Sequence, residues 1–177
     1  MEYIRLTAPF DKAELAKLRA GDRVLLSGVI YTARDAGHKR MYDAILGGGE
    51  LPISLEGQGI YYVGACFDKS GKPISAGPTT AMRMDKYAPT LYDNGVGASI
   101  GKGDRGQAVY DAIVRNKAVY LCAIGGAGAT YADCIKSSTL VAYGELGTEA
   151  MYKFEVENFP LIVAIDGEGN SIFRSRV

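Results

Sequence analysis

The sequence predicts a single α/β domain over residues 1–177, with a mixed β-sheet and flanking helices. Apolar stretches rich in β-branched residues, which are typical of buried strands, recur at 23–32, 59–67, 118–124 and 161–165. Segments with helical patterns lie between them, and the chain contains neither an internal repeat nor a linker. This alternation favours one α/β domain, which at 177 residues would bury roughly two thirds of its unfolded surface.

The N-terminal third contains two predicted helices and one predicted strand. Asp11 and Glu14 have the spacing of a capping box, so residues 11–18 are expected to form a short helix. The strand at 23–32 leads directly into a helix at 33–46, which ends at three consecutive glycines. One face of this second helix carries Ala36, Met41, Ala44 and Ile45.

The middle of the chain is expected to hold a short extended piece at 51–55 and a buried strand at 59–67, ended by a turn at 68–71. Gly77 and Pro78 form a corner after this turn. Because proline suits the first position of a helix, a helix is expected to begin here.

A helix that begins at Pro78 would place Thr79 and Thr80 at backbone N–H groups without intrahelical partners, which makes an anion pocket. Arg83, one turn later, would add a guanidinium that can hold a carboxylate at two points. The alternative is an ordinary capped helix start in which Arg83 and Asp85 form a surface ion pair.

The C-terminal half alternates again between helices and strands. Asp104 is expected to cap an amphipathic helix, and the strand at 118–124 is apolar on both faces, as a central parallel strand would be. The apolar positions of the Asp104 helix are Ala108, Val109, Ala112 and Ile113. The remaining predictions are a helix at 86–92, a glycine-rich loop or strand at 95–103, a short helix up to Lys136, strands at 139–143 and 152–156, and a hairpin over 161–173.

Composition argues against several classes of function. Lys and Arg number 20, as do Asp and Glu, so no net charge attracts nucleic acid or an anionic membrane. No apolar run reaches the ~20 residues of a membrane helix, and the N-terminus does not resemble a signal peptide, so a cytoplasmic protein is expected. The cysteines, Cys66, Cys122 and Cys134, form no Cys-x-x-Cys motif. We therefore expect no metal site within this chain, and we expect Cys66 and Cys122 to be buried.

Three cationic side chains lie on well-separated segments. Arg34 follows the strand at 23–32, Arg83 follows the Gly-Pro corner, and Lys102 lies between two glycines. Since open α/β sheets bind ligands at strand ends, the three cations could converge on a small dicarboxylate. Simpler roles stay open: Lys102 as a solvated lysine on a turn, Asp35 as a helix cap, and His38, the only histidine, as a structural hydrogen-bonding group.

The glycine-rich stretches do not establish a nucleotide site. The stretch 125–128, with Glu145 beyond it, partly matches a dinucleotide fingerprint, but Tyr131 occupies the third glycine position. Close packing of a helix on a strand explains these glycines equally well. The P-loop pattern fails around the lysine between two glycines, because Val96 replaces the first glycine and Gly103 replaces the magnesium-binding hydroxyl residue.

Four motifs, taken in order, resemble the β subunit or C-terminal region of class I iron–sulfur hydro-lyases, the family of class I fumarate hydratase and L-tartrate dehydratase. They are Ala-Arg-Asp-Ala-Gly-His-Lys at 33–39, Ala-Gly-Pro-Thr-Thr-Ala-Met-Arg-Met-Asp at 76–85, Ile-Gly-Lys-Gly at 100–103, and the segment 147–160. The similarity covers essentially the whole chain. Gly37 and Met82 depart from the family, which often has alanine and a small residue at these positions.

The resemblance implies a swivelling β/β/α domain that closes over an oxygen-sensitive [4Fe–4S] cluster held by a partner α subunit and not by this chain. The implied roles are substrate binding by Arg34, Thr80, Arg83 and Lys102, catalysis by Thr79, Arg83 and Lys102, and orientation of these groups by Asp35, His38 and Asp85. Thr79 would lie beside the carbon that exchanges a proton. Because a threonine hydroxyl is a poor base, Thr79 would need help from Lys102 or from the partner.

The leading hypothesis is the β subunit of a two-subunit hydro-lyase that interconverts fumarate and (S)-malate, a reaction of the tricarboxylic acid cycle, and that is active only with the α subunit. The close alternative is the β subunit of L-tartrate dehydratase. A non-catalytic dicarboxylate-binding module and a nucleotide-binding protein are further alternatives. We expect a hetero-oligomer with the α subunit, and a homodimer is the alternative for the chain in isolation.

Overall fold

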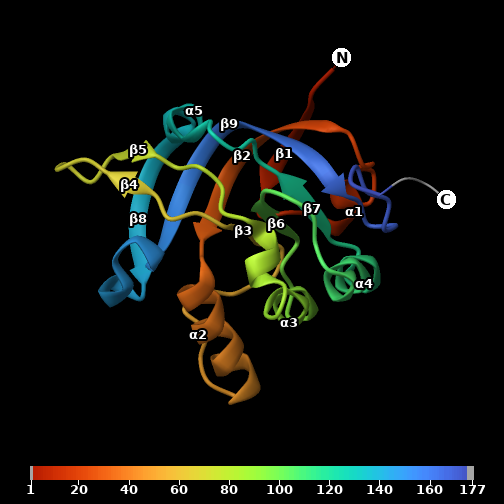
Figure 1. The fold of residues 1–177 in the computed structure, drawn as a ribbon, viewed down its shortest axis with the longest axis horizontal. Helices are drawn as coiled ribbons and strands as arrows, with labels where there is room; N and C mark the ends of the chain where they lie inside the picture. The colour runs from red at the N-terminus through yellow and green to blue at the C-terminus, as the bar shows by residue number, and fades with distance from the viewer. Residues whose placement is uncertain (1, 175–177) are drawn as a thin grey trace.

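The chain folds around one mixed β-sheet of seven strands in a computed structural model that describes residues 2–174 (Figure 1). The strand order is β1-β2-β3-β6-β7-β9-β8, and a two-stranded sheet, β4-β5, accompanies it. The strands are β1 (Ile4–Ala8), β2 (Arg23–Thr32), β3 (Gly59–Tyr61), β4 (Cys66–Phe67), β5 (Pro73–Ser75), β6 (Ala98–Gly101), β7 (Val119–Cys122), β8 (Ile135–Ala142) and β9 (Met151–Ile165). The helices are α1 (Lys12–Leu15), α2 (Asp35–Leu46), α3 (Ala88–Asp93), α4 (Gln107–Asn116) and α5 (Gly128–Asp133), with 3-10 helices η1 (Ala81–Met84) and η2 (Gly144–Glu149). The predicted α/β class with a mixed sheet and flanking helices is confirmed.

The antiparallel pairing of β2 with β9 closes the large sheet into a ring. One edge of β2 pairs in parallel with β1 and, further along, with β3, while its other edge pairs with β9. Strands β3, β6 and β7 continue in parallel, and β7 pairs antiparallel with the end of β9. Strands β2, β3, β6, β7 and β9 therefore form a closed circuit of hydrogen bonds, and β8 adds to it along β9.

Alternating residues of the ring strands belong to two apolar cores. In β7, Val119 and Leu121 belong to one core and Tyr120 to the other, as the two-residue period of a strand requires. The first core includes side chains of α1 and α5. The second includes side chains of α2, α3 and α4, which Figure 1 shows grouped on one side of the sheet. The strand predicted at 118–124 is thus apolar on both faces, parallel to β6 and antiparallel to β9.

The four parallel strands β2, β3, β6 and β7 end at the same edge of the sheet. Thr32 pairs with Tyr61, Tyr61 with Ile100, and Gly101 with Cys122. The loops that follow these strands are therefore neighbours, at the edge where open α/β sheets bind ligands. This edge positions the candidate site.

Two N-terminal predictions are confirmed. The strand predicted at 23–32 has the bounds of β2, and the helix predicted at 33–46 begins at Asp35 and ends as expected. Asp11 caps α1 by accepting a hydrogen bond from the backbone N–H of Ala13 at 2.6 Å. The helix α1 itself is a single turn.

The expected strand at 59–67 is interrupted. β3 ends at Tyr61, and the chain then leaves the large sheet and forms the β4–β5 hairpin. Cys66 lies on this hairpin and is exposed, so its predicted burial is wrong, and Cys122 is half-buried. The piece predicted at 51–55 is not a strand.

The C-terminal strands are longer and fewer than predicted. The strands predicted at 152–156 and 161–165 are parts of β9, which pairs with β2 and β8 along its length. The hairpin predicted over 161–173 is reduced to one bridge between Ile165 and Ser171.

The helix cap predicted at Asp104 is wrong. Gly106 holds the N-cap position of α4, while the Asp104 carboxylate accepts hydrogen bonds from the N–H of Arg105 and the hydroxyl of Tyr110, each at 2.7 Å. Ala108 is exposed on this helix and Tyr110 is buried instead. None of the helices within residues 2–174 is long and apolar enough to cross a membrane.

Candidate functional site

Arg34 follows β2 and holds the N-cap position of α2. Its side chain passes against Gly64, where a Cβ atom would lie 2.6 Å from Nη1 and 3.0 Å from Cδ of Arg34. The Nε atom of Arg34 is buried and has no hydrogen-bond partner within residues 2–174. Because buried polar groups in proteins are nearly always paired, Arg34 presents a donor that a bound ligand can satisfy.

Arg83 lies on η1, and its side chain reaches the first turn of α2. Its Nε donates a hydrogen bond to Oδ1 of Asp35 at 3.3 Å, and its Nη2 lies 2.9 Å from Oδ2. Both side chains are partly exposed, which limits the stabilisation from such a pair to about 1 kcal/mol or less. The pair therefore acts mainly to hold Arg83 beside the segment that carries Arg34, with about half of the Arg83 side chain still accessible.

The segment from Thr79 to Ala81 pairs with the end of β6. Thr80 forms a parallel bridge with Lys102. The N–H of Lys102 donates to the carbonyl of Thr79 at 3.2 Å, and the N–H of Ala81 donates to the carbonyl of Lys102 at 2.9 Å. The N–H of Thr79 donates to the carbonyl of Tyr62 at 2.7 Å. The two threonines are thus fixed between the loops that follow β3 and β6.

The helix predicted to start at Pro78 is wrong. η1 begins only at Ala81, and the N–H groups of Thr79 and Ala81 are used in pairing with neighbouring strands. The predicted anion pocket of unpaired N–H groups is therefore not formed by Thr79. An anion at this edge would therefore have to be bound by side chains.

Lys102 lies between β6 and the loop after β7. Its side chain runs along Gly125, where a Cβ atom would lie 3.5 Å from Cδ and 3.7 Å from Nζ of the lysine. Lys102 is exposed, and no acidic side chain of residues 2–174 lies within ion-pair distance of it. Its ammonium is therefore available to an anionic ligand.

The residues predicted to bind substrate share one edge of the sheet. The segment from Thr79 to Arg83 joins the loops after β6 and β2, because its first residues bond to Lys102 and its last side chain binds Asp35, next to Arg34. Three segments far apart in the sequence thereby place two guanidinium groups, one ammonium group and two hydroxyl groups at this edge.

His38 lies in the interior behind Arg34. The side chain is fully buried, its Nδ1 lies 2.9 Å from the carbonyl oxygen of Arg34, and Tyr62 packs edge-on against the ring with the centroids 4.9 Å apart. Burial lowers the pKa of His38 to about 4, so the ring is neutral at pH 7 and Nδ1 donates to the carbonyl. This bond steadies the backbone of Arg34.

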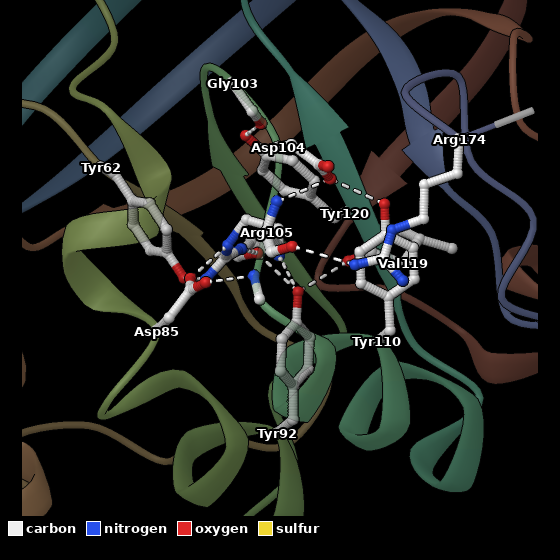
Figure 2. A network of polar contacts seen from close by, with 12 residues as sticks. Tyr62, Asp85, Tyr92, Gly103, Asp104, Arg105, Tyr110, Val119, Tyr120 and Arg174 are labelled. Carbon is white, nitrogen blue, oxygen red and sulfur yellow. Dashed lines mark hydrogen bonds and ion pairs between the residues drawn. The ribbon is translucent and has the colours of Figure 1, made fainter.

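Asp85 follows η1 and faces the interior, where Arg105 binds it (Figure 2). The Nε of Arg105 donates to Oδ1 of Asp85 at 2.7 Å, and the N–H of Gly106 donates to Oδ2. The alternative prediction of a surface ion pair between Arg83 and Asp85 is therefore wrong, because the two side chains bind different partners.

Sequence reasoning missed Gly64 and Arg105. A glycine inside an apolar strand pattern is a signal of close backbone approach, so Gly64 was within reach of prediction. Nothing in the local sequence separates a buried arginine from a solvated one, because burial depends on which segments pack around it. Arg105 therefore required the structure.

Gly128, the last glycine of the stretch 125–128, has a packing role. A Cβ atom at Gly128 would lie 2.5 Å from Oγ of Ser75. The N–H of Ala76 donates to the carbonyl of Gly128 at 3.0 Å. α5 thus packs closely on β5, which supports the packing explanation over the dinucleotide fingerprint.

The thiols of this chain do not fit a [4Fe–4S] cluster. Cys66 lies on β4, Cys122 on β7 and Cys134 directly after α5. Within residues 2–174, no three His, Cys, Asp or Glu side chains gather as metal ligands. A cluster at this site would depend on ligands from outside this chain.

Comparison with known proteins identifies the family. The family model described as Fumarase C-terminus matches residues 1–176. The chain belongs to the fumarase C-terminal family. The resemblance that the motifs indicated is thereby confirmed, and the four motifs lie within the matched region.

Relatives of this fumarase C-terminal chain differ in length. It is 39% identical over 175 residues to a putative class I fumarate hydratase of Geobacillus stearothermophilus, and 41% identical over 169 residues to the anaerobic class I fumarate hydratase of Escherichia coli K12. These alignments cover 96% and 93% of the chain but only 33% and 31% of the two relatives. A putative L(+)-tartrate dehydratase subunit beta of Methanocaldococcus jannaschii is 37% identical over 169 residues, which cover 92% of the chain and 87% of that relative.

Replacing His38 should remove a pH dependence from the stability of the chain. The folded-state pKa of about 4 lies below the ordinary value of 6.5, so the unfolded chain takes up this proton first and stability falls as the pH drops from 6.5 toward 4. Between pH 7 and pH 5 this loss amounts to about 2 kcal/mol. His38→Asn keeps a donor near the Nδ1 position but has no group that titrates there. We therefore expect its free energy of unfolding to fall by about 2 kcal/mol less than that of the wild type between pH 7 and pH 5. Urea unfolding of the wild type and the variant at both pH values measures these free energies. An equal loss of stability in the two proteins would contradict the prediction.

Proposed function

We propose that this chain is the β subunit of a hydro-lyase that interconverts fumarate and (S)-malate, and that it binds the two carboxylates of the substrate. The observation that carries the proposal is the placement of Arg34, Arg83 and Lys102 at one edge of the sheet. The unpaired, buried Nε of Arg34 supports it further, because a carboxylate would supply the missing acceptor.

The proposed roles follow from charge and reach. Arg34 and Arg83 suit carboxylates, because a guanidinium donates two parallel hydrogen bonds to one carboxylate. Lys102 contributes a point charge and Thr80 a hydroxyl donor. Thr79, whose backbone is fixed on both sides, would lie beside the carbon that exchanges a proton. Because a threonine hydroxyl needs a neighbour to take its proton, Lys102 or a partner group would assist it.

We propose that a partner α subunit supplies the rest of the active site. The chain spans about a third of the length of the class I fumarate hydratases that it matches, and its own thiols lie on separate elements. A [4Fe–4S] cluster would therefore be held by the partner. The present chain would close over it as a swivelling domain, with the edge that carries the cations facing inward.

A second candidate is the β subunit of an L-tartrate dehydratase. The relative of that name in Methanocaldococcus jannaschii is a subunit of similar length, since the alignment covers 87% of it. Tartrate is also a four-carbon dicarboxylate, so the same three cations would serve it. The added hydroxyl group has no distinguishing partner among the residues named above.

Anaerobic co-production with the protein that carries the remainder of the class I fumarase sequence tests the proposal. The loss of ultraviolet absorbance of fumarate and, separately, the dehydration of L-tartrate are measured for the complex and for this chain alone. We expect turnover of fumarate by the complex, its loss in air, and no turnover by the chain alone. Turnover of L-tartrate without fumarate would favour the second candidate. A chain that binds malate tightly by itself and forms no complex would be a binding module.

Lys102→Ala should abolish most of the activity without unfolding the chain. Removing a charge-assisted contact of about 2–3 kcal/mol should lower kcat/KM of the complex about 30- to 150-fold. Because Lys102 is exposed and has no ion-pair partner among residues 2–174, the melting temperature should stay within about 2 °C of the wild-type value. The control is Lys69→Ala, an exposed lysine of the turn between β4 and β5, which should alter neither quantity. Wild-type kcat/KM in Lys102→Ala would remove this residue from the site.

Gly64→Ala should displace the guanidinium of Arg34. The added Cβ would overlap Nη1 at 2.6 Å, and the far end of a flexible side chain can move away more easily than the backbone. We therefore expect KM of the complex to rise about tenfold. Gly49→Ala is the matched control, because a Cβ there meets its nearest atom at 3.6 Å. Steady-state kinetics of both variants provide the measurement. If the KM of Gly64→Ala equals that of Gly49→Ala and of the wild type, the proposed role of Arg34 is contradicted.

A further inference from the structure

Arg105 is a fully buried arginine at the centre of a polar network behind the site (Figure 2). Its Nε donates to Oδ1 of Asp85 at 2.7 Å, its Nη1 to Oγ of Ser99 at 2.9 Å, and its Nη2 to the hydroxyl of Tyr62 at 3.3 Å. The guanidinium carbon lies 5.3 Å from the ring centre of Tyr62 and 4.8 Å from that of Tyr120. Each end of this guanidinium therefore has a separate partner.

Two of these partners belong to segments that carry proposed substrate contacts. Asp85 directly follows η1, the helix that presents Arg83. Tyr62 directly follows β3, and its carbonyl accepts the N–H of Thr79. By holding both Asp85 and Tyr62, Arg105 fixes the two ends of the segment from Thr79 to Asp85.

The remaining contacts tie the same guanidinium to the end of β6. Ser99 lies on β6, close in sequence to Lys102. Tyr120, whose ring packs on the guanidinium, donates its hydroxyl to the carbonyl of Gly103 at 2.9 Å. Arg105 itself lies in the loop that begins with Lys102 and ends at Gly106. The contacts of Arg105 thus hold the segment that carries Lys102 as well as the segment that carries Arg83.

The charge of Arg105 is matched within the network. Burial by itself lowers the pKa of the guanidinium, but the oxygens of Tyr62, Tyr92 and Asp85 raise it above its ordinary value, so the group stays charged. A buried ion pair contributes little net stability compared with apolar residues of the same volume. Its most distinct effect is to specify one geometry, since a guanidinium must satisfy several partners at fixed directions.

We propose that Arg105 is a positioning residue that sets the distance between Arg83 and Lys102, and thereby the fit of a ligand with two carboxylates. The inference rests on the proposed function. A dicarboxylate engages both cations at once and gains affinity only when their separation matches its length. A monocarboxylate engages one cation at a time and is indifferent to that separation.

The test is competitive inhibition of the complex by succinate and by propionate, measured against whichever of fumarate or L-tartrate the wild-type complex turns over. In Arg105→Lys the charge remains, but an ammonium cannot reach three partners in fixed directions. We expect the inhibition constant for succinate to rise about tenfold and that for propionate to change less than twofold. A variant that is merely less well folded would lower kcat and leave both inhibition constants unchanged.

Two further variants complete the test. Arg115→Lys is the matched control, because Arg115 forms two hydrogen bonds of 2.7 Å with Asp93 on the exposed surface. It should change neither inhibition constant. Tyr62→Phe removes only the hydroxyl that accepts from Nη2, and it should shift the succinate constant in the same direction as Arg105→Lys. This milder variant decides the matter if Arg105→Lys does not assemble.

The outcomes separate the two proposals. Unchanged succinate inhibition in every assembled variant, while the wild-type complex binds succinate, would overturn the role of Arg105 and leave the proposed function standing. A wild-type complex that neither turns over fumarate or L-tartrate nor binds succinate would overturn the proposed function, and the role of Arg105 with it.

Discussion

The pairing of β2 with β9 is the constraint on which the rest of the structure depends. Because β9 bonds to β2 along one edge and to β7 along the other, the parallel strands between them must curve until the sheet closes. Closure leaves the ring strands without free edges and brings the ends of β2, β3, β6 and β7 side by side. Every residue proposed to bind substrate comes from a loop or short helix beyond one of those ends. The site is therefore a consequence of the sheet closing.

An element of the fold could be predicted where its own residues determine it, and could not where it depends on partners distant in the sequence. β2 was predicted with the correct bounds because its own residues are apolar and β-branched, which indicates a buried strand. β1 was not predicted, since its five residues pair only with β2 and three of them are exposed. The division of β9 into two predicted strands has the same cause: its continuity depends on partners more than a hundred residues away in the sequence.

The candidate site shows the same division. Arg34, Arg83 and Lys102 were predicted as a group because each lies at a turn where a strand or helix begins or ends. The pocket of N–H groups was predicted wrongly, since the local sequence allows a helix at Pro78 and only the tertiary pairing of Thr79 with Tyr62 prevents it. Arg105 could not be predicted, because burial of an arginine requires partners on three separate segments.

The two buried or half-buried arginines of this region, Arg34 and Arg105, show how a structural cation differs from one poised for a ligand. Every donor atom of the Arg105 side chain has a partner, and a carboxylate balances its charge. Arg34 keeps a buried Nε that has no hydrogen-bond partner in the described part of the chain, and Gly64 leaves its side chain room. An unsatisfied buried donor costs free energy in the unliganded chain, and a ligand that supplies the acceptor recovers it. In the proposed function, Arg105 would define the geometry of the site, and Arg34 would supply part of the free energy of binding.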